Sequence, residues 1–171
     1  MNEIRTSTTL AVRSPERRAA ARESLGIAPD AVVVLAIPPI TADSDHMLGA
    51  WACKLFQKVN SRARFLLPRG GEEYYNLLRF FTATEHLDVL VTPPPATALT
   101  VLIEASDLGL AVPAGPAAGA AIREAYEAGL RLMLSVTAAQ AANLPDGGRV
   151  RVCEPLTAKV LARALVEMFE S

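Results

Sequence analysis

The residues of this chain whose types and spacing could do chemistry gather in one stretch, Val112 to Gly129, which reads VPAGPAAGAAIREAYEAG. The pattern is typical of a strand end, a Gly/Pro turn and the beginning of a helix, where α/β proteins often hold an anionic ligand. Free backbone amides and the helix dipole favour phosphate at the helix start, over 116–119. One acidic side chain, Glu124, lies near that start. The stretch therefore indicates a ligand site.

Several familiar catalytic motifs are absent from the sequence. No GxxxxGK[ST] follows a predicted strand, and the spacing of Gly115 and Gly119 is not that of a dinucleotide fingerprint. There is no GxSxG elbow. The third predicted strand is followed by Thr92, where a phospho-acceptor receiver domain would have Asp. P-loop, dinucleotide, hydrolase and receiver chemistries are therefore excluded.

The cysteines and histidines do not indicate a metal site. Cys53 and Cys153 are far apart, with no CxxC or Cys/His cluster near either, and we expect both to be small core residues. His46 and His86 have no neighbour at ligand spacing, and we expect them to be polar residues at helix ends. We therefore expect neither a metal nor a cofactor.

Composition limits the class of protein further. The chain has 171 residues, 51% of them apolar, which is enough for one globular domain. Its net charge is −1 and its lysines and arginines are scattered, so we do not expect nucleic acid as a partner. No apolar run reaches the ~20 residues of a membrane span, and the N-terminus lacks the apolar core of a signal peptide. We therefore expect a cytoplasmic protein.

Strand-like and helix-like segments alternate along the chain. Short apolar runs predict strands at 31–37, 64–67, 87–91, 108–112, 131–136 and 149–153. Between and after them, helices are predicted at 45–62, 72–84, 97–106, 117–128, 138–144 and 156–171. A leading helix is also predicted, because Ser14 suits an N-cap, Pro15 the first helical position and Gly26 the residue past the end.

This alternation requires parallel strands joined by right-handed crossovers. The predicted fold is a doubly wound, Rossmann-like α/β sheet of about six strands with helices on both faces. We expect residues 14–171 to form this single domain, and residues 1–13 to be a linker or a strand from an upstream region. Ligands of such sheets bind beyond the carboxyl ends of the strands, where the strand order reverses. The loops there are 38–45, 68–71, 92–96, 113–119 and 137–140.

The segment 105–136, ASDLGLAVPAGPAAGAAIREAYEAGLRLMLSV, resembles the signature region of the C-terminal, donor-binding domain of the retaining GT-B glycosyltransferases. That group is typified by sucrose and glycogen synthases and mannosyltransferases. Residues 105–113 match the family's strand, Gly119 matches the second glycine of its turn, and 124–129 match its E-A-M-A-x-G. A less specific similarity extends over residues 14 to 170.

The resemblance implies glycosyl transfer, with retention, from a nucleotide-diphosphate sugar. Glu124 corresponds to the glutamate that accepts hydrogen bonds from the ribose hydroxyls, since a fixed carboxylate can bind two vicinal OH groups. The helix start and Arg69 would contact phosphate, and Thr92 begins a loop beside the base. The implied donor-binding residues are Glu124, Gly119, Ala117, Ala118, Gly115, Arg69 and Thr92. No catalytic residue is assigned.

The sequence departs from the family at the charged positions. Pro116 occupies the place of the first motif glutamate, Pro38 lies near the place of an arginine, and 42–44 near that of a lysine. In the family these cations neutralise the leaving diphosphate. Charge-assisted hydrogen bonds contribute about 1.5–3 kcal/mol each, so three losses remove roughly 4–8 kcal/mol, while a micromolar ligand holds only about 8 kcal/mol. We therefore expect weak or no activity from the chain alone.

Two alternatives remain open. Such transferases use two domains that close over a cleft, so the chain could work with an N-terminal acceptor domain or a protein partner. It could instead be a non-catalytic interaction module on a degenerate glycosyltransferase fold. A third possibility is a small-ligand binder of flavodoxin-like shape that uses the same crevice for another anion.

Overall fold

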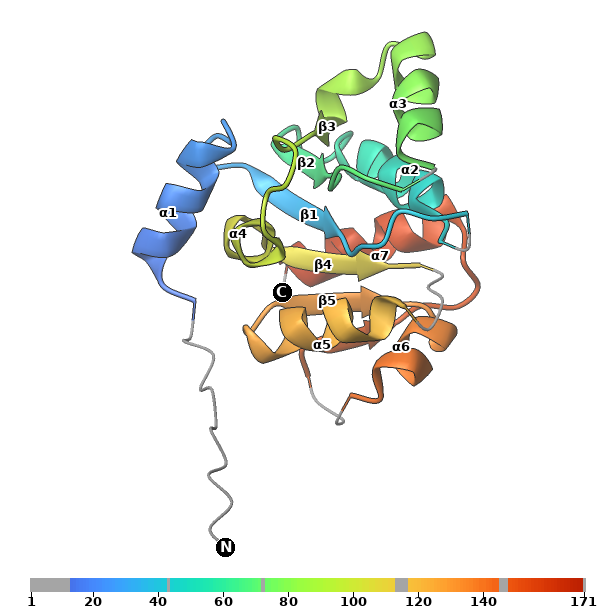
Figure 1. Cartoon of the computed structure of the whole chain (residues 1–171). Coiled ribbons are helices and arrows are strands. Elements are labelled where there is room, and N and C mark those ends of the chain that lie inside the picture. Colours follow the sequence, from blue (N-terminus) through green and yellow to red (C-terminus); the bar gives the residue numbers. More distant parts are fainter. Residues whose placement is uncertain (1–12, 43, 72, 113–116, 145–147, 171) are drawn as a thin grey trace, which may run out of the picture.

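The computed structural model describes residues 13–170 except 43, 72, 113–116 and 145–147 (Figure 1). Its strands are β1 (Val32–Ala36), β2 (Ala63–Leu66), β3 (Leu90–Val91), β4 (Leu108–Ala111), β5 (Arg131–Leu134) and β6 (Val150–Val152). Its α-helices are α1 (Pro15–Ser24), α2 (His46–Phe56), α3 (Glu73–Ala83), α4 (Leu99–Ala105), α5 (Ala118–Glu127), α6 (Val136–Ala142) and α7 (Ala158–Glu170). A 3-10 helix, η1 (Leu87–Val89), precedes β3.

The six strands form one parallel sheet in the order β3-β2-β1-β4-β5-β6. The chain builds the sheet outward from β1 to β3, and then returns to place β4 on the other side of β1. The strand order therefore reverses between β1 and β4, which is where ligands of such sheets bind. The predicted doubly wound α/β fold is confirmed.

Helices cover both faces of the sheet, because successive side chains of a strand point to opposite sides. In β1, Val34 and Ala36 pack into a core layer with α2, α3 and α7, whereas Val33 and Leu35 pack into a second layer with α1, α4, α5 and α6. In Figure 1, α5 crosses in front of β5 while α7 runs behind the sheet. The unbroken apolar run of β1 follows from this burial on both faces.

The leading helix begins as its sequence predicts. Ser14 is the N-cap of α1 and its hydroxyl accepts a hydrogen bond from the Arg17 amide at 3.2 Å. Pro15 takes the first helical position, where its missing N–H costs nothing. Gly26 follows the helix with a φ of 65°, a left-handed conformation that suits glycine.

Three predicted elements differ from the structure. The first is the helix predicted at 45–62, which ends at Phe56. The strand predicted at 87–91 is a 3-10 helix followed by the two-residue strand β3, and the Asp88 carboxylate in its first part binds Lys54 Nζ at 2.8 Å. The strand predicted at 131–136 ends at Leu134. Ser135 caps α6, because its hydroxyl accepts from the Ala138 amide at 3.2 Å, so Val136 is helical. The Ser135 hydroxyl thus competes with continuation of the strand at this boundary.

No helix within the described ranges is long and apolar enough to cross a membrane. Among the same residues, no group of three or more His, Cys, Asp and Glu side chains could hold a metal ion. The segment expected to be an upstream linker, 1–13, lies outside the described residues except for Arg13.

Candidate functional site

The carboxyl ends of β1 and β4 meet at the reversal of strand order. Helix α5 starts here, and Ala117 at its N-cap is exposed and offers no side-chain cap. Ala118 and Gly119 follow, both buried. This is the geometry of a helix N-terminus at the switch point of a doubly wound sheet. Gly115 and Pro116, which precede it, lie outside the described residues.

The loop after β1 closes directly onto the end of β4. The Asp45 amide donates to the Val112 carbonyl at 3.0 Å, which bridges the two strands' ends. Ser44 Oγ donates to the Thr41 carbonyl at 2.8 Å and accepts from the Thr41 amide at 3.1 Å. The loop is therefore held against β4 by its own hydrogen bonds rather than open between the strands.

His46, the first residue of α2, packs against the same loop. Its side chain is buried, and Nε2 lies 3.2 Å from the Pro39 carbonyl oxygen, so this nitrogen is a donor there. Burial lowers the pKa of His46, and the Pro39 carbonyl and Asp45 offset only part of that effect. The imidazole is thus a neutral structural group. The expectation that His46 is a polar residue at a helix end agrees with its position.

The loop after β2 packs tightly on the loop after β1. Gly71 has a φ of 86°, and a Cβ built on it would lie 1.7 Å from the Ile40 carbonyl oxygen. Only glycine allows so close an approach of two backbones. Arg69, two residues earlier, is exposed.

A hollow of about 450 Å³, here called the carboxyl-edge hollow, lies between the loop after β1 and α3. It is lined by Ala42, Ser44, Asp45, His46, Met47, Glu73 and Leu77. Asp45 and Glu73 are the charged residues of this described lining, and no lysine or arginine belongs to it. A carboxylate-lined hollow repels phosphate, so it does not supply the diphosphate contact that the family places after this strand.

Glu124 is half-buried on α5 and lines a different surface depression, a groove of about 510 Å³ here called the α1–α4 groove. The groove is lined by Arg17, Ala20, Ala21, Ser24, Thr100, Val101, Ile103, Glu104, Glu124 and Ala128. Its walls are mostly apolar, with Glu104 of α4 and Arg17 of α1 as the other charged residues. Glu124 therefore lies beside α4 and α1 and not in the carboxyl-edge hollow.

The other expected donor-binding residues are spread along the carboxyl edge. Arg69 follows β2 and Thr92 follows β3; both are exposed. Neither lines the carboxyl-edge hollow or the α1–α4 groove. The structure brings Ala117, Ala118 and Gly119 together in the first turn of α5, and it does not bring Arg69 or Thr92 into one hollow with Glu124.

Gly119 has a packing role that the sequence does not reveal. A Cβ built on it would lie 2.6 Å from the Ala141 carbonyl oxygen of α6 and 3.5 Å from an Arg123 nitrogen. The Arg123 guanidinium itself donates to the Ala142 carbonyl at 3.3 Å. The glycine therefore permits close contact of α5 with α6, whatever its relation to a ligand.

The largest of these depressions lies at the opposite edge of the sheet and was missed by the sequence analysis. This amino-edge pocket, of about 580 Å³, is lined by Arg13, Ser14, Pro15, Arg18, Pro29, Asp30, Ala31, Val32, Asp107, Gly129, Arg131 and Phe169. Its size does not make it the donor site, because ligands of doubly wound sheets bind at the carboxyl ends. The signal in the sequence was the close spacing of Arg13 and Arg18 at the start of the predicted leading helix. Asp107 and Arg131 join them only through the order of the strands.

Comparisons with known proteins identify the fold. No family model matches the chain, and no curated protein matches it. Among solved structures, WaaG, a glycosyltransferase involved in lipopolysaccharide biosynthesis, aligns with a TM-score of 0.72 at 19% identity, over 92% of this chain and 43% of that one. A glycosyltransferase from Rickettsia africae aligns with a TM-score of 0.73 at 16% identity, over 92% and 42%.

HepE from Anabaena, solved in complex with UDP and glucose, aligns with a TM-score of 0.71 at 19% identity, over 95% of this chain and 45% of that one. The chain therefore has a GT-B glycosyltransferase-like fold. At these identities the likeness shows the fold alone. The chain spans less than half the length of each of these structures.

Proposed function

We propose that this chain is the donor-side, C-terminal-type domain of a retaining GT-B glycosyltransferase, and that it binds the nucleoside diphosphate of a sugar donor weakly without transferring sugar by itself. The observation that carries the proposal is the start of α5 at the reversal between β1 and β4, with Glu124 further along the same helix. Amides of a helix start favour phosphate, and a carboxylate suits ribose hydroxyls.

Weak binding follows from the charges at the carboxyl edge. The described lining of the carboxyl-edge hollow carries Asp45 and Glu73 and no cation. The bond between the Asp45 amide and the Val112 carbonyl occupies the gap between the two strand ends. Without two cationic contacts worth about 1.5–3 kcal/mol each, a micromolar site becomes a millimolar one.

Transfer requires more than this domain. Glycosyl transfer from a nucleotide sugar needs an acceptor held against the donor with water excluded. The structural neighbours have more than twice the aligned length. We therefore propose that an acceptor-binding domain or a protein partner completes any active site.

A second function, a non-catalytic interaction module, is favoured by one specific observation. Aromatic side chains of α3 stand exposed on the surface: Tyr75 is 68% exposed and Phe80 41% exposed. Exposed aromatic residues are enriched at protein interfaces. Under this function the crevice binds no nucleotide, so the two functions differ in a measurable way.

Thermal unfolding in the presence of UDP distinguishes the two functions. If the Kd is about 1 mM, 10 mM UDP adds about 1.4 kcal/mol of stability and raises the Tm by about 3–5 °C. Glu124→Ala is expected to abolish this rise. Glu127→Ala, an exposed position on the same helix, is the matched control and is expected to retain it.

The absence of any Tm rise in the unaltered chain at 10 mM UDP and GDP would favour the interaction module. A rise that persists in Glu124→Ala would refute the role assigned to Glu124.

A further inference from the structure

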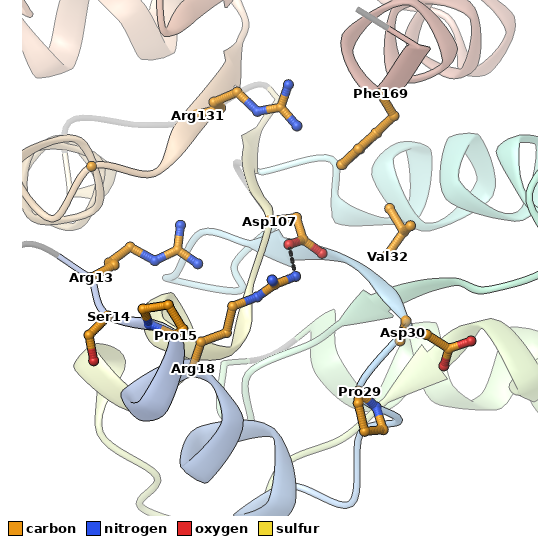
Figure 2. A pocket seen from close by; sticks show the side chains of 12 residues that line it. Arg13, Ser14, Pro15, Arg18, Pro29, Asp30, Val32, Asp107, Arg131 and Phe169 are labelled. Carbon is orange, nitrogen blue, oxygen red and sulfur yellow. Dashed lines mark hydrogen bonds and ion pairs between the residues drawn. The ribbon is translucent and has the colours of Figure 1, made fainter.

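The amino-edge pocket gathers three arginines from separate parts of the fold. Arg13 precedes α1, Arg18 lies in α1, and Arg131 begins β5. Figure 2 shows Arg13, Arg18 and Arg131 around Asp107; the Arg18 guanidinium meets the Asp107 carboxylate, and that of Arg131 extends toward Phe169. Arginines that converge on a shared hollow place their N–H donors in a geometry suited to oxyanions.

The carboxylate of Asp107 already accepts three hydrogen bonds. Its Oδ2 accepts from Arg22 Nη2 at 2.8 Å and from the Val33 amide at 2.8 Å. Its Oδ1 accepts from Arg18 Nη2. One negative charge is thus shared by two guanidinium groups, and Arg22 is the buried one of the two. A positive charge remains after this pairing.

Arg13 and Arg131 donate their hydrogen bonds to neutral carbonyl groups rather than to carboxylates. Arg13 donates to the Ser106 carbonyl and to the Glu104 carbonyl, the latter at 3.3 Å. Arg131 donates to the Met168 carbonyl at 2.5 Å and lies 5.0 Å from the centre of the Phe169 ring. Carbonyl dipoles and a ring face orient these cations without neutralising them.

Two buried donors in the cluster have no hydrogen-bond partner among the described residues, namely Arg13 Nε and Arg18 Nε. Burial also lowers the pKa of Arg13, and the carboxylates of Glu104 and Asp107 offset only part of that effect. The remaining acid in the lining, Asp30, is 66% exposed and lies 3.8 Å from Arg62. An anion bound in the pocket would therefore accept hydrogen bonds from these unpaired donors and would balance the remaining positive charge.

We propose that the amino-edge pocket is a binding site for a small anion that carries two linked phosphoryl groups, held between Arg13, Arg18 and Arg131. Its volume of about 580 Å³ lies in the range of small-ligand pockets, about 300–1,000 Å³. Guanidinium groups bind phosphoryl oxygens through two parallel N–H donors. The site is at the opposite edge of the sheet from α5's first turn, so it is independent of the proposed donor site.

The test is a titration of the full chain with inorganic pyrophosphate, followed through backbone amide NMR shifts and by calorimetry. The largest shifts are expected at Val32, Asp107 and 129–131, which border the pocket. Arg13→Gln and Arg131→Gln remove the charge and leave a shorter, uncharged polar side chain, and each is expected to raise the Kd about tenfold or more. Arg79→Gln, on the exposed surface of α3, is the matched control and is expected to leave the Kd unchanged.

A second arm uses UDP, which contains the same two phosphoryl groups attached to a nucleoside. If the amide signals of the pocket shift with pyrophosphate but not with UDP, the ligand is a free diphosphate. If they shift with both, the pocket also accepts a nucleoside diphosphate. Both results support the site.

Three outcomes would overturn it. Pyrophosphate shifts confined to Ala117, Ala118 and Gly119 would place the anion at the other edge. An equal response to sodium chloride at matched ionic strength would show screening without binding. An unchanged Kd in both folded Arg→Gln variants would show that these guanidinium groups do not hold the anion; the NMR arm on the unaltered chain decides the matter if either variant unfolds.

Discussion

At the scale of single residues, Gly119 and His46 show how positions that look like ligand contacts also hold the fold. Gly119 lies at the start of α5, where the resemblance places a phosphate, yet its missing side chain is required by the Ala141 carbonyl. His46 begins α2, just after the loop in which the resemblance implies cations, and it is buried against the Pro39 carbonyl. Both residues have a structural explanation that needs no ligand.

Gly119→Ala is expected to destabilise the chain by about 1–3 kcal/mol, because the new methyl group overlaps backbone that cannot rotate away. The free energy of unfolding in urea measures this effect. Gly148→Ala is the control: no atom lies within 4 Å of a Cβ built there, and the expected change is below about 0.5 kcal/mol. Equal effects of the two substitutions would contradict the packing explanation.

His46 is expected to make stability depend on pH. Because burial lowers the pKa of His46 in the folded chain below that of an ordinary histidine, about 6.5, the unfolded chain binds more protons in this range. The contribution of His46 to the free energy of unfolding is therefore complete above about pH 6.5 and is lost as the pH falls through the pKa of His46 in the folded chain. The measurement is urea unfolding between pH 7.5 and pH 5.

His46→Gln should flatten this pH dependence, whereas His86→Gln, whose ring is half-exposed, should leave it in place. A pH profile that His46→Gln does not change would assign the effect to other groups.

The sequence predicted part of the residue-level picture. The helix predicted at 117–128 is confirmed as α5, and the role of Glu124 stays a prediction drawn from motif letters at fixed spacing. The resemblance could not place Glu124 in a groove formed with α1 and α4, since this depends on how α1 packs. The sequence also could not predict that Arg13, Arg18 and Arg131 line one pocket, because the order of the strands is what brings them close together.

At the scale of elements, a hydrogen-bond network that includes Asp107 attaches α1 to the sheet. Arg22 of α1 is 2% exposed and donates to Asp107, to the Ala105 carbonyl at 3.0 Å and to the Ala31 carbonyl at 2.9 Å. Asp107 in turn accepts from the Val33 amide of β1. This network joins the helix to the starts of β1 and β4.

Asp107→Asn is expected to lower the free energy of unfolding by about 2–4 kcal/mol, because Arg22 would remain buried without its counter-charge. Chemical denaturation is the appropriate measurement. Asp30→Asn is the control at the same edge, since its pair with Arg62 is exposed on both sides, and should change stability by less than about 0.5 kcal/mol. A loss below that figure for Asp107→Asn would show that the network is not essential to the docking of α1.

Element boundaries were predicted well for α1 and poorly for β3 and for the end of β5, where the Ser135 cap was not recognised. Ser14, Pro15 and Gly26 predicted α1 because caps act locally. The strand predicted at 87–91 was mostly wrong, since Asp88 binds Lys54 of α2, a contact between distant parts of the chain. Such long-range partners cannot be derived from local periodicity.

At the scale of the whole molecule, the two edges of the sheet carry side chains of opposite charge. The described lining of the carboxyl-edge hollow is acidic, whereas the amino-edge pocket contains Arg13, Arg18 and Arg131. The alternation of strands and helices predicted the layers of this sheet. Which residues share an edge became visible only with the order of strands.

We propose that the carboxyl edge keeps a donor site without the cations that would hold its diphosphate. The affinity of the chain for UDP tests this directly, measured by calorimetry in the Arg13→Gln background so that the amino-edge pocket contributes little. We expect a Kd in the millimolar range, and about tenfold tighter binding when Ala42→Lys restores a cation in the exposed loop after β1. A micromolar Kd without this lysine would contradict the claim.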